Sequence, residues 1–454
     1  MLFSNSKSKG LALAALGAVL LGASFIFFAD RSLAAPKEKA AITAKVDKAA
    51  KAVKATKKEK SSNSAAAKNA ALQAAPAIKA HLSPWEEALN QRLTALLQHD
   101  LFQRSQLGMI VYDLTSEKVV FQHQPKQLLR PASTMKSLGA LTALDKLSSY
   151  YQFHTKLAYD GTITDGVLTG NIYCIGGFDP LFDSRDMQAF VDSVKALGIH
   201  TIQGILIADV SMMDGPRWGI GWCWDDDEYN PPLFPLLVNG QDKFMQVFQS
   251  KLREAQITPP VLVVRGETPA TAKELCVRSH GIQEVLQPML KDSDNLCAEA
   301  LFYQLAAFQR SKHATADDAR AVVNQFISKL GLHPAYYNIA DGCGLSLYDY
   351  LSPELEIALL KYAYAHQDIY KVFYPALAIG GVDGTLDYRM HNKALKGAVH
   401  AKTGTLTGVS ALAGYTTAPN GHLLAFSIMN NGVLDTPEVQ SWQDEVCLFL
   451  YTTK

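Results

Sequence analysis

The sequence lacks the signatures of several common hydrolase classes. Its 454 residues contain no Gly-x-Ser-x-Gly, no His-Glu-x-x-His and no Walker A loop. It also contains no Cys-x-x-Cys pair and no zinc-ligand spacing, so we expect neither a metal nor another cofactor. Internal repeats are absent, and 48% hydrophobic against 19% charged residues excludes a disordered or coiled-coil chain. The length is enough for two or three domains.

The chain has no formal net charge, but its charges are distributed unevenly. Residues 36–80 contain eleven Lys and only three acidic residues, so residues 81–454 are net acidic. An acidic surface repels the phosphate backbone of DNA and RNA. We therefore expect no nucleic-acid partner for this part of the chain.

Residues 1–35 have the pattern of an export signal. Lys7 and Lys9 precede an uncharged apolar run at residues 11–28, and Ser32-Leu33-Ala34 offers small residues for cleavage. The run is long for a cleaved signal and short for a membrane span of about 20 residues. A cleaved signal peptide and a retained inner-membrane anchor therefore both stay open. Either one predicts that the rest of the chain lies in the periplasm or cell envelope.

An Ala/Lys-rich linker without aromatic residues is predicted for residues 36–82. One interpretation is a solvated, partly helical connection, because Ala and Lys are good helix formers. The other is a basic arm attracted to anionic lipid or to acidic wall polymers. The chain also has six Cys, and an even count in an exported protein is compatible with disulfides as well as with free, buried thiols.

Beyond the linker, strand-like and helical segments alternate. The patterns predict a hairpin from residues 108–113 and 118–123, and strands at residues 397–402, 410–416 and 423–429. They predict helices at residues 133–147, 297–308, 316–330 and 438–451. Because strands at both ends enclose helices, we expect an α/β (α+β) fold. Its antiparallel sheet would be flanked by helices and completed by distant parts of the chain.

The segment 151–280 has a different pattern and is predicted to be an inserted β-rich domain. Short strand-like pieces at residues 170–175, 204–209 and 260–265 accompany one helical stretch at residues 186–197. The remaining segments, 83–150 and 281–454, would then form one domain.

The first motif that could carry out catalysis is Ser133-Thr134-Met135-Lys136, at the predicted start of a helix. Residues three apart share a helix face, so Lys136 can take the proton of the Ser133 hydroxyl if its amine is neutral. Helix-start N–H groups can stabilise developing negative charge. The pattern is weak alone, since Ser4/Lys7 and Ser6/Lys9 repeat it.

Two further motifs follow along the chain. Ser293-Asp294-Asn295 lies between helical stretches, where Ser293 can pass a proton and Asn295 can bind a substrate amide. Lys402-Thr403-Gly404-Thr405 ends a strand-like run, where charge and hydroxyl can hold a carboxylate. Gly404 removes bulk beside the strand edge, and the following N–H groups can bind an oxyanion.

In this order the three motifs match those of penicillin-recognising serine enzymes. The chain resembles the D-alanyl-D-alanine carboxypeptidase/endopeptidase family of class C penicillin-binding proteins. The stretches that carry the resemblance are RPASTMK (130–136), GNIYCIGGFDP (170–180), GWCWDD (221–226), SDNLCAE (293–299), DGCGLS (341–346), GVDGTL (381–386) and AKTGTL (401–406).

The resemblance implies a β-lactamase/transpeptidase-like catalytic domain and roles for matching residues. Ser133 is implied to be the acylated nucleophile, Lys136 the general base and Ser293 the proton relay to the leaving amine. Asn295 is implied to hold the peptide. Lys402, Thr403 and Thr405 are implied to bind the terminal carboxylate, with the N–H groups of Ser133 and Thr405 as the oxyanion hole. The partners would be peptidoglycan stem peptides and β-lactams.

Asp226 stands where the family contacts the amino group of the dibasic stem-peptide residue, although it also belongs to an acidic run that solvent could surround. Two departures accompany the match: the insert is short after Asn239, and Cys343 replaces the usual Ser. The alternatives to a D,D-peptidase are a β-lactamase and a silent penicillin- or wall-binding protein. Carboxypeptidase and endopeptidase action stay open.

Overall fold

The computed structural model describes residues 83–223 and 230–454. The predicted export signal, the Ala/Lys-rich linker and Asp226 lie outside these residues. None of the helices in the described part is both long and apolar enough to cross a membrane.

The larger sheet joins strands from both ends of the chain. Its order is β11 (Ala378–Ile379), β12 (Val399–Leu406), β13 (Val409–Thr417), β14 (Leu423–Asn431), β1 (Gln106–Asp113) and β2 (Lys118–His123). All of its pairs are antiparallel, and β14 pairs with β1 across more than 300 residues of sequence. The hairpin and the antiparallel sheet completed by distant segments are therefore confirmed.

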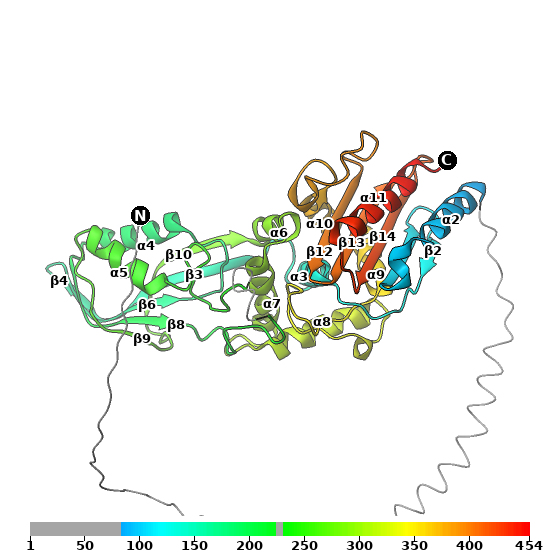
Figure 1. Ribbon diagram of the computed structural model, residues 1–454. Helices are drawn as coiled ribbons and strands as arrows, with labels where there is room; N and C mark the ends of the chain where they lie inside the picture. The colour runs from blue at the N-terminus through cyan, green and yellow to red at the C-terminus, as the bar shows by residue number, and fades with distance from the viewer. Residues whose placement is uncertain (1–82, 224–229) are drawn as a thin grey trace, which may run out of the picture. The chain divides into compact units, whose positions relative to one another are not determined.

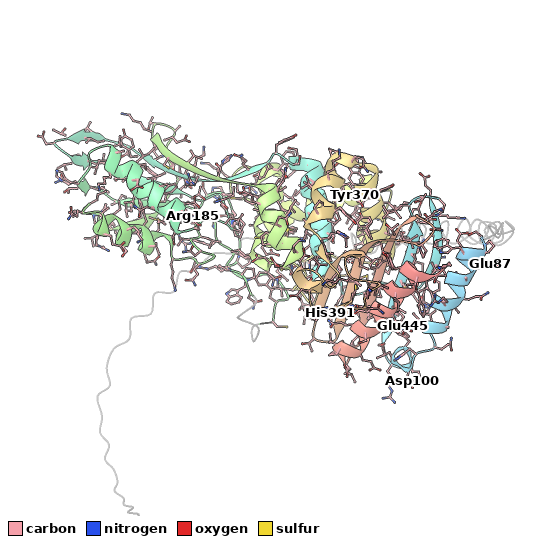
Figure 2. The ribbon with its side chains drawn as sticks, turned by 90° about the horizontal axis from the view of Figure 1, so that it is seen from above. Glu87, Asp100, Arg185, Tyr370, His391 and Glu445 are labelled. Carbon is pink, nitrogen blue, oxygen red and sulfur yellow. The ribbon has the colours of Figure 1, made fainter. Side chains whose placement is uncertain are left out.

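Helices cover both faces of this sheet, which explains the nearly continuous apolar sequence of β1. Side chains alternate along a strand, so Met109 and Val111 face one layer while Ile110 and Tyr112 face the other. The first layer is α2 (Pro84–Leu96) with α11 (Thr436–Thr452), and Figure 1 shows α11 in front of β13 and β14. The outer faces of these two helices carry exposed acids such as Glu87 and Glu445 (Figure 2).

The opposite face packs against a helical layer. It is made of α3 (Met135–Leu147), α6 (Ile282–Lys291), α7 (Asn295–Gln309), α8 (Ala316–Lys329), α9 (Pro353–Ala365) and α10 (Gln367–Ala376). Residues 135–144 of α3 are all buried, so this helix lies inside the layer. The predicted helices at 133–147, 297–308, 316–330 and 438–451 are present with bounds shifted by a few residues.

A second sheet is formed by residues between α3 and α6. Its order is β10 (Lys273–Gly281), β3 (Gln152–Tyr159), β6 (Ile172–Ile175), β8 (Leu206–Asp209) and β9 (Val263–Arg265). A small sheet of β4 (Thr162–Thr164), β5 (Val167–Thr169) and β7 (Thr201–Gln203) accompanies it. Figure 1 shows α4 (Ser184–Ala196) and α5 (Phe244–Glu254) beside these strands.

The expectation of a single helix in residues 151–280 is wrong, because α5 is a second one. Only Phe244, Phe248 and Leu252 are buried in it, four residues apart. This four-residue spacing is the helical one, so the sequence does carry the signal of α5 and the expectation overlooks it. The long pair β10–β3 was also missed. Most residues of β10 are half-buried or exposed, so it lacks an apolar run.

Candidate active site

Ser133 lies in a short turn that leads into a buried helix. The 3-10 helix η2 (Ala132–Thr134) precedes α3, and Ala132 has a positive φ of 48°. Such a conformation is strained for a residue with a side chain and occurs often at functional sites. Ser133 is half-buried, whereas Lys136 is fully buried one turn further along. The hydroxyl can therefore meet a ligand while the amine is shielded from water.

The Lys136 amine makes three short contacts. Its Nζ lies 2.9 Å from Ser133 Oγ, 2.8 Å from Asn295 Oδ1 and 2.7 Å from the carbonyl oxygen of Cys343. Burial lowers the pKa of Lys136 below its ordinary value, although the acids Asp341 and Glu299 act in the opposite direction. A neutral amine at this distance can accept the Ser133 proton.

Two buried acids behind Lys136 hold the loop at residues 341–346. Asp341 Oδ1 accepts the N–H groups of Cys343 and Gly344, and Glu299 Oε1 accepts that of Gly342. Burial, together with the charge of Asp341, raises the pKa of Glu299 to about 8. A protonated Glu299 opposes deprotonation of Lys136 less than a carboxylate would.

These two acids and a cysteine have the composition of a metal site. In the described part of the chain, one ligand atom each of Glu299, Asp341 and Cys343 lies within 4.8 Å of the others. Asp341 Oδ2 further accepts the Trp222 indole N–H at 2.7 Å and the Ser346 N–H at 2.8 Å. The carboxylate oxygens therefore already serve as acceptors for N–H groups, which fits a structural role for this cluster.

Ser293 stands in the short loop between α6 and α7. Asp294 caps α7 by accepting the Cys297 N–H at 2.7 Å, and the N–H of Asp294 donates to the Pro288 carbonyl. Ser293 itself has a positive φ of 67°. The cap and the turn present Ser293 and Asn295, the first residue of α7, on the same side as Lys136.

Lys402 joins this loop to strand β12. Its Nζ lies 2.9 Å from Ser293 Oγ and 2.9 Å from the Thr403 carbonyl oxygen. Lys402 is fully buried, and burial, followed by the charge of Lys136, holds its pKa well below the ordinary range. A carboxylate that arrives beside it would restore the charged form. Thr403 is hydrogen-bonded through its hydroxyl to that of Thr385, at 2.7 Å.

Part of β12 is available as an edge for a ligand. Strand β11 pairs only with His400 and Ala401, so among the described strands none pairs with residues 402–406 on that side. A Cβ on Gly404 would lie 2.5 Å from the Pro131 carbonyl oxygen and 3.2 Å from the Ser133 nitrogen. The turn that carries Ser133 is thus packed directly on β12, beside Thr405. The absent side chain makes room for this turn in addition to any substrate.

The structure therefore brings Ser133, Lys136, Ser293, Asn295 and Lys402 together, with Thr403, Gly404 and Thr405 adjoining on β12. It also adds contacts that the motifs did not reveal. The Cys343 carbonyl is a backbone group, so its residue type gives no signal. Thr385 could be suspected only from its place in GVDGTL.

The six Cys all lie in the described part of the chain and are free. The structure therefore has free thiols and not the disulfides that their even number would also allow.

The chain on both sides of the undescribed segment 224–229 is anchored near this site. Before it, Trp222 contacts Asp341 and the Ile220 carbonyl accepts the Ser346 hydroxyl. After it, residues 230–232 line a cavity of about 350 Å³ together with Ser293 and Asn295. Asp226 itself lies outside the described residues, so its predicted contact with an amino group stays a prediction.

Comparisons with known proteins agree with this geometry. Residues 89–242 and 236–452 match the D-Ala-D-Ala carboxypeptidase 3 (S13) family. A D-alanyl-D-alanine carboxypeptidase of Actinomadura sp. (strain R39) is 26% identical over 461 residues, covering 80% of this chain and 84% of the relative. The carboxypeptidase DacB of Haemophilus influenzae is 24% identical over 419 residues, covering 74% and 87%.

The fold has a close counterpart among solved structures. Penicillin-binding protein 4 of Haemophilus influenzae superimposes with a TM-score of 0.74 at 23% identity, over 79% of this chain and 99% of that one. An endopeptidase of Bdellovibrio bacteriovorus in complex with an immunity protein gives 0.51 at 16% identity, over 76% and 92%. Since the family match spans nearly all of residues 89–452, the chain belongs to the D-Ala-D-Ala carboxypeptidase 3 (S13) family of serine hydrolases.

Proposed function

We propose that this chain cleaves the D-Ala–D-Ala bond of peptidoglycan stem peptides through an acyl-enzyme on Ser133. The observation that carries the proposal is the short distance of 2.9 Å between the buried Lys136 amine and the Ser133 hydroxyl, beside the Ser293–Lys402 pair. Family membership supports the same reaction class.

The reaction would run in two stages. The neutral amine of Lys136 takes the proton of Ser133 as Oγ bonds to the carbonyl carbon of the penultimate D-alanine. The oxyanion that forms points at the N–H groups of Ser133 and Thr405. When the intermediate collapses, the amine of the terminal D-alanine leaves with a proton passed through Ser293. Water then attacks the acyl-enzyme and releases the shortened peptide.

Substrate placement would use the open edge of β12. The terminal carboxylate would lie beside Lys402 and Thr403, and the Asn295 side chain would hold the peptide. Charge-assisted hydrogen bonds of this kind fix orientation as well as affinity. A β-lactam would enter the same way and acylate Ser133, because its amide is strained. It would stay bound as the acyl-enzyme, because its leaving group remains tethered.

The first test is mass spectrometry of purified muropeptides after incubation with the enzyme. Release of D-alanine from pentapeptides identifies a carboxypeptidase, and conversion of crosslinked dimers to monomers identifies an endopeptidase. Ser133→Ala is the matched control and should leave every muropeptide unchanged. Penicillin binding without any cleavage would support a silent binding protein. Fast turnover of nitrocefin would support a β-lactamase.

The location and the accessory parts belong to the same proposal. Export by residues 1–35 would place the enzyme at its substrate in the periplasm or envelope. The Ala/Lys-rich linker would bridge to membrane or wall, and residues 151–280 would act as an inserted domain.

Asp226 would select a free side-chain amine on the stem peptide. Asp226→Ala should then weaken cleavage of peptides with that amine more than of acetylated ones, whereas equal loss on both would remove this role.

A further inference from the structure

Glu356 is a buried acid whose hydrogen bonds reach the turn that carries Ser133. It lies on α9 and is 2% exposed. One carboxyl oxygen, Oε1, is hydrogen-bonded to the hydroxyl of Thr134, the residue after Ser133. The other, Oε2, accepts the Ser427 hydroxyl of β14 at 2.6 Å. Glu356 thus connects the turn to the central sheet.

The number of protons available to these groups points to the charge state of Glu356. Thr134 Oγ1 lies within hydrogen-bond distance of two acceptors, Glu356 Oε1 and the Pro131 carbonyl oxygen at 2.9 Å. A hydroxyl has one proton and cannot donate to both. If Glu356 carries a proton, it donates to Thr134, Thr134 donates to Pro131 and Ser427 donates to Oε2. All three hydrogen bonds are then made.

An ionised Glu356 would be unfavourable in this position. In the described part of the chain, the side chains that act on it are Thr134 and Ser427, and both are neutral. A buried carboxylate without a cation pays a large desolvation penalty. Burial accordingly raises the pKa of Glu356 to about 7, against the effect of these two hydrogen bonds.

A second link from β14 supports the same turn at its other end. Asn431 accepts the Arg130 N–H at 2.8 Å and donates to the Arg130 carbonyl at 3.1 Å. Ser427 and Asn431 are four residues apart on one strand, so they lie on the same face. The turn is therefore held between β14, through these two links, and Gly404 of β12.

We propose that Glu356 is a positioning residue that works as a neutral carboxylic acid: by donating to Thr134 it fixes the turn and so the direction of the Ser133 hydroxyl and N–H. The inference rests on the proposed acylation of Ser133. It adds a residue that belongs to none of the three motifs and that touches no substrate.

The test uses two substitutions of similar volume, Glu356→Gln and Glu356→Leu. The Gln amide can donate to Thr134 while its carbonyl accepts from Ser427, whereas Leu does neither. The readout is the acylation rate constant with a fluorescent penicillin, measured apart from the binding constant. The Gln variant should stay within about 3-fold of the parent, and the Leu variant should be slowed at least about 10-fold, as for loss of a buried hydrogen-bond partner.

Two further variants separate positioning from stability. Leu359→Ala, on the same helix, should lower the melting temperature but leave the acylation rate of the folded protein unchanged. Thr134→Val removes the hydroxyl with little change of shape, should reproduce the rate defect, and decides the question if Glu356→Leu does not fold.

Three results would overturn the inference. Equal slowing of acylation by Glu356→Gln and Glu356→Leu would mean that the ionised carboxylate is needed. Acylation at the full rate in both Glu356→Leu and Thr134→Val would mean that the hydrogen bond between Glu356 and Thr134 does not position Ser133. Absence of labelling in the unmodified protein would overturn the proposed function itself, and this role with it.

Discussion

Lys402 and Ser293 are 109 positions apart in the sequence, yet the Lys402 amine donates to the Ser293 hydroxyl across 2.9 Å. The same distance separates the Lys136 amine from the Ser133 hydroxyl. Two buried lysine amines therefore each contact one serine in a single site. Burial removes each amine from water and so favours its neutral form. A neutral amine can accept a proton from the serine that it contacts.

Replacement of Lys136 by Arg should slow acylation severely, because it puts a permanent charge where the neutral amine stands. Arginine does not lose its proton in proteins, so it cannot act as the base. We expect the acylation rate with penicillin to fall by roughly 10²–10⁴-fold, the usual contribution of general-base catalysis. Stopped-flow labelling measures it, and Lys136→Gln serves as a smaller variant. A rate within 10-fold of the parent in both would remove Lys136 as the base.

Acylation should be lost as the pH falls through the pKa of Lys136. The neutral amine is the active form, and burial lowers its pKa below the ordinary value. The acid limb of the pH–rate profile should therefore lie below 10.5, the value for an exposed lysine. The profile of acylation by penicillin between pH 5 and 10.5 checks this. A rate that keeps rising steeply to the top of that range would indicate an unshifted lysine.

The spacing of Ser133 and Lys136 was enough to predict their contact, because residues three apart meet on one helix face. The antiparallel sheet was equally predictable from apolar runs such as that of β1. By contrast, the contact between Ser293 and Lys402 depends on tertiary packing. The sequence predicted it only through the family resemblance that the order of the three motifs carries. Contacts made by backbone, such as the Cys343 carbonyl, leave no trace in residue type.

Glu356 illustrates a different limit of sequence reasoning. It is one of two acids in the first turn of a mostly apolar helix, where an exposed position on the outer face is the ordinary interpretation. Only the packing of α9 against β14 reveals that it is buried against Thr134 and Ser427. Helix α5 is a different case, because Phe244, Phe248 and Leu252 have helical spacing and its sequence does carry the signal.

Gly404→Ala should slow acylation because it displaces the turn that carries Ser133, and not because it blocks the substrate. The new Cβ would lie 2.5 Å from the Pro131 carbonyl oxygen, so the turn or β12 must move. We expect a loss of at least about 100-fold in the acylation rate, as for small displacements of reacting groups. Gly139→Ala on α3 is the matched control, because its Cβ finds no atom closer than 3.8 Å. Equal behaviour of the two variants would contradict this account of the turn.

Lys402→Gln should remove the preference for a free terminal carboxylate. The parent enzyme should cleave an acyl-D-Ala-D-Ala peptide roughly 10- to 100-fold faster, by kcat/KM, than the same peptide with a terminal amide, since a hydrogen bond to a charged group is at stake. In the variant this ratio should approach one. A ratio that stays unchanged would place the carboxylate elsewhere.

The thiols offer a check that is independent of activity. All six Cys of the sequence are free in the structure. Protein denatured without reductant should therefore react with six equivalents of a maleimide, counted by intact mass. Four equivalents or fewer would reveal at least one disulfide, and the site beside Cys343 would need to be reconsidered.

The most direct measurement of the central claim is covalent labelling by a penicillin, read by intact mass and peptide mapping. The parent protein should gain the mass of one penicillin, on the peptide that contains Ser133. Ser133→Ala should gain none while it melts at the same temperature as the parent. Stoichiometric label on that variant, or a label mapped to another residue, would contradict the assignment of Ser133 as the nucleophile.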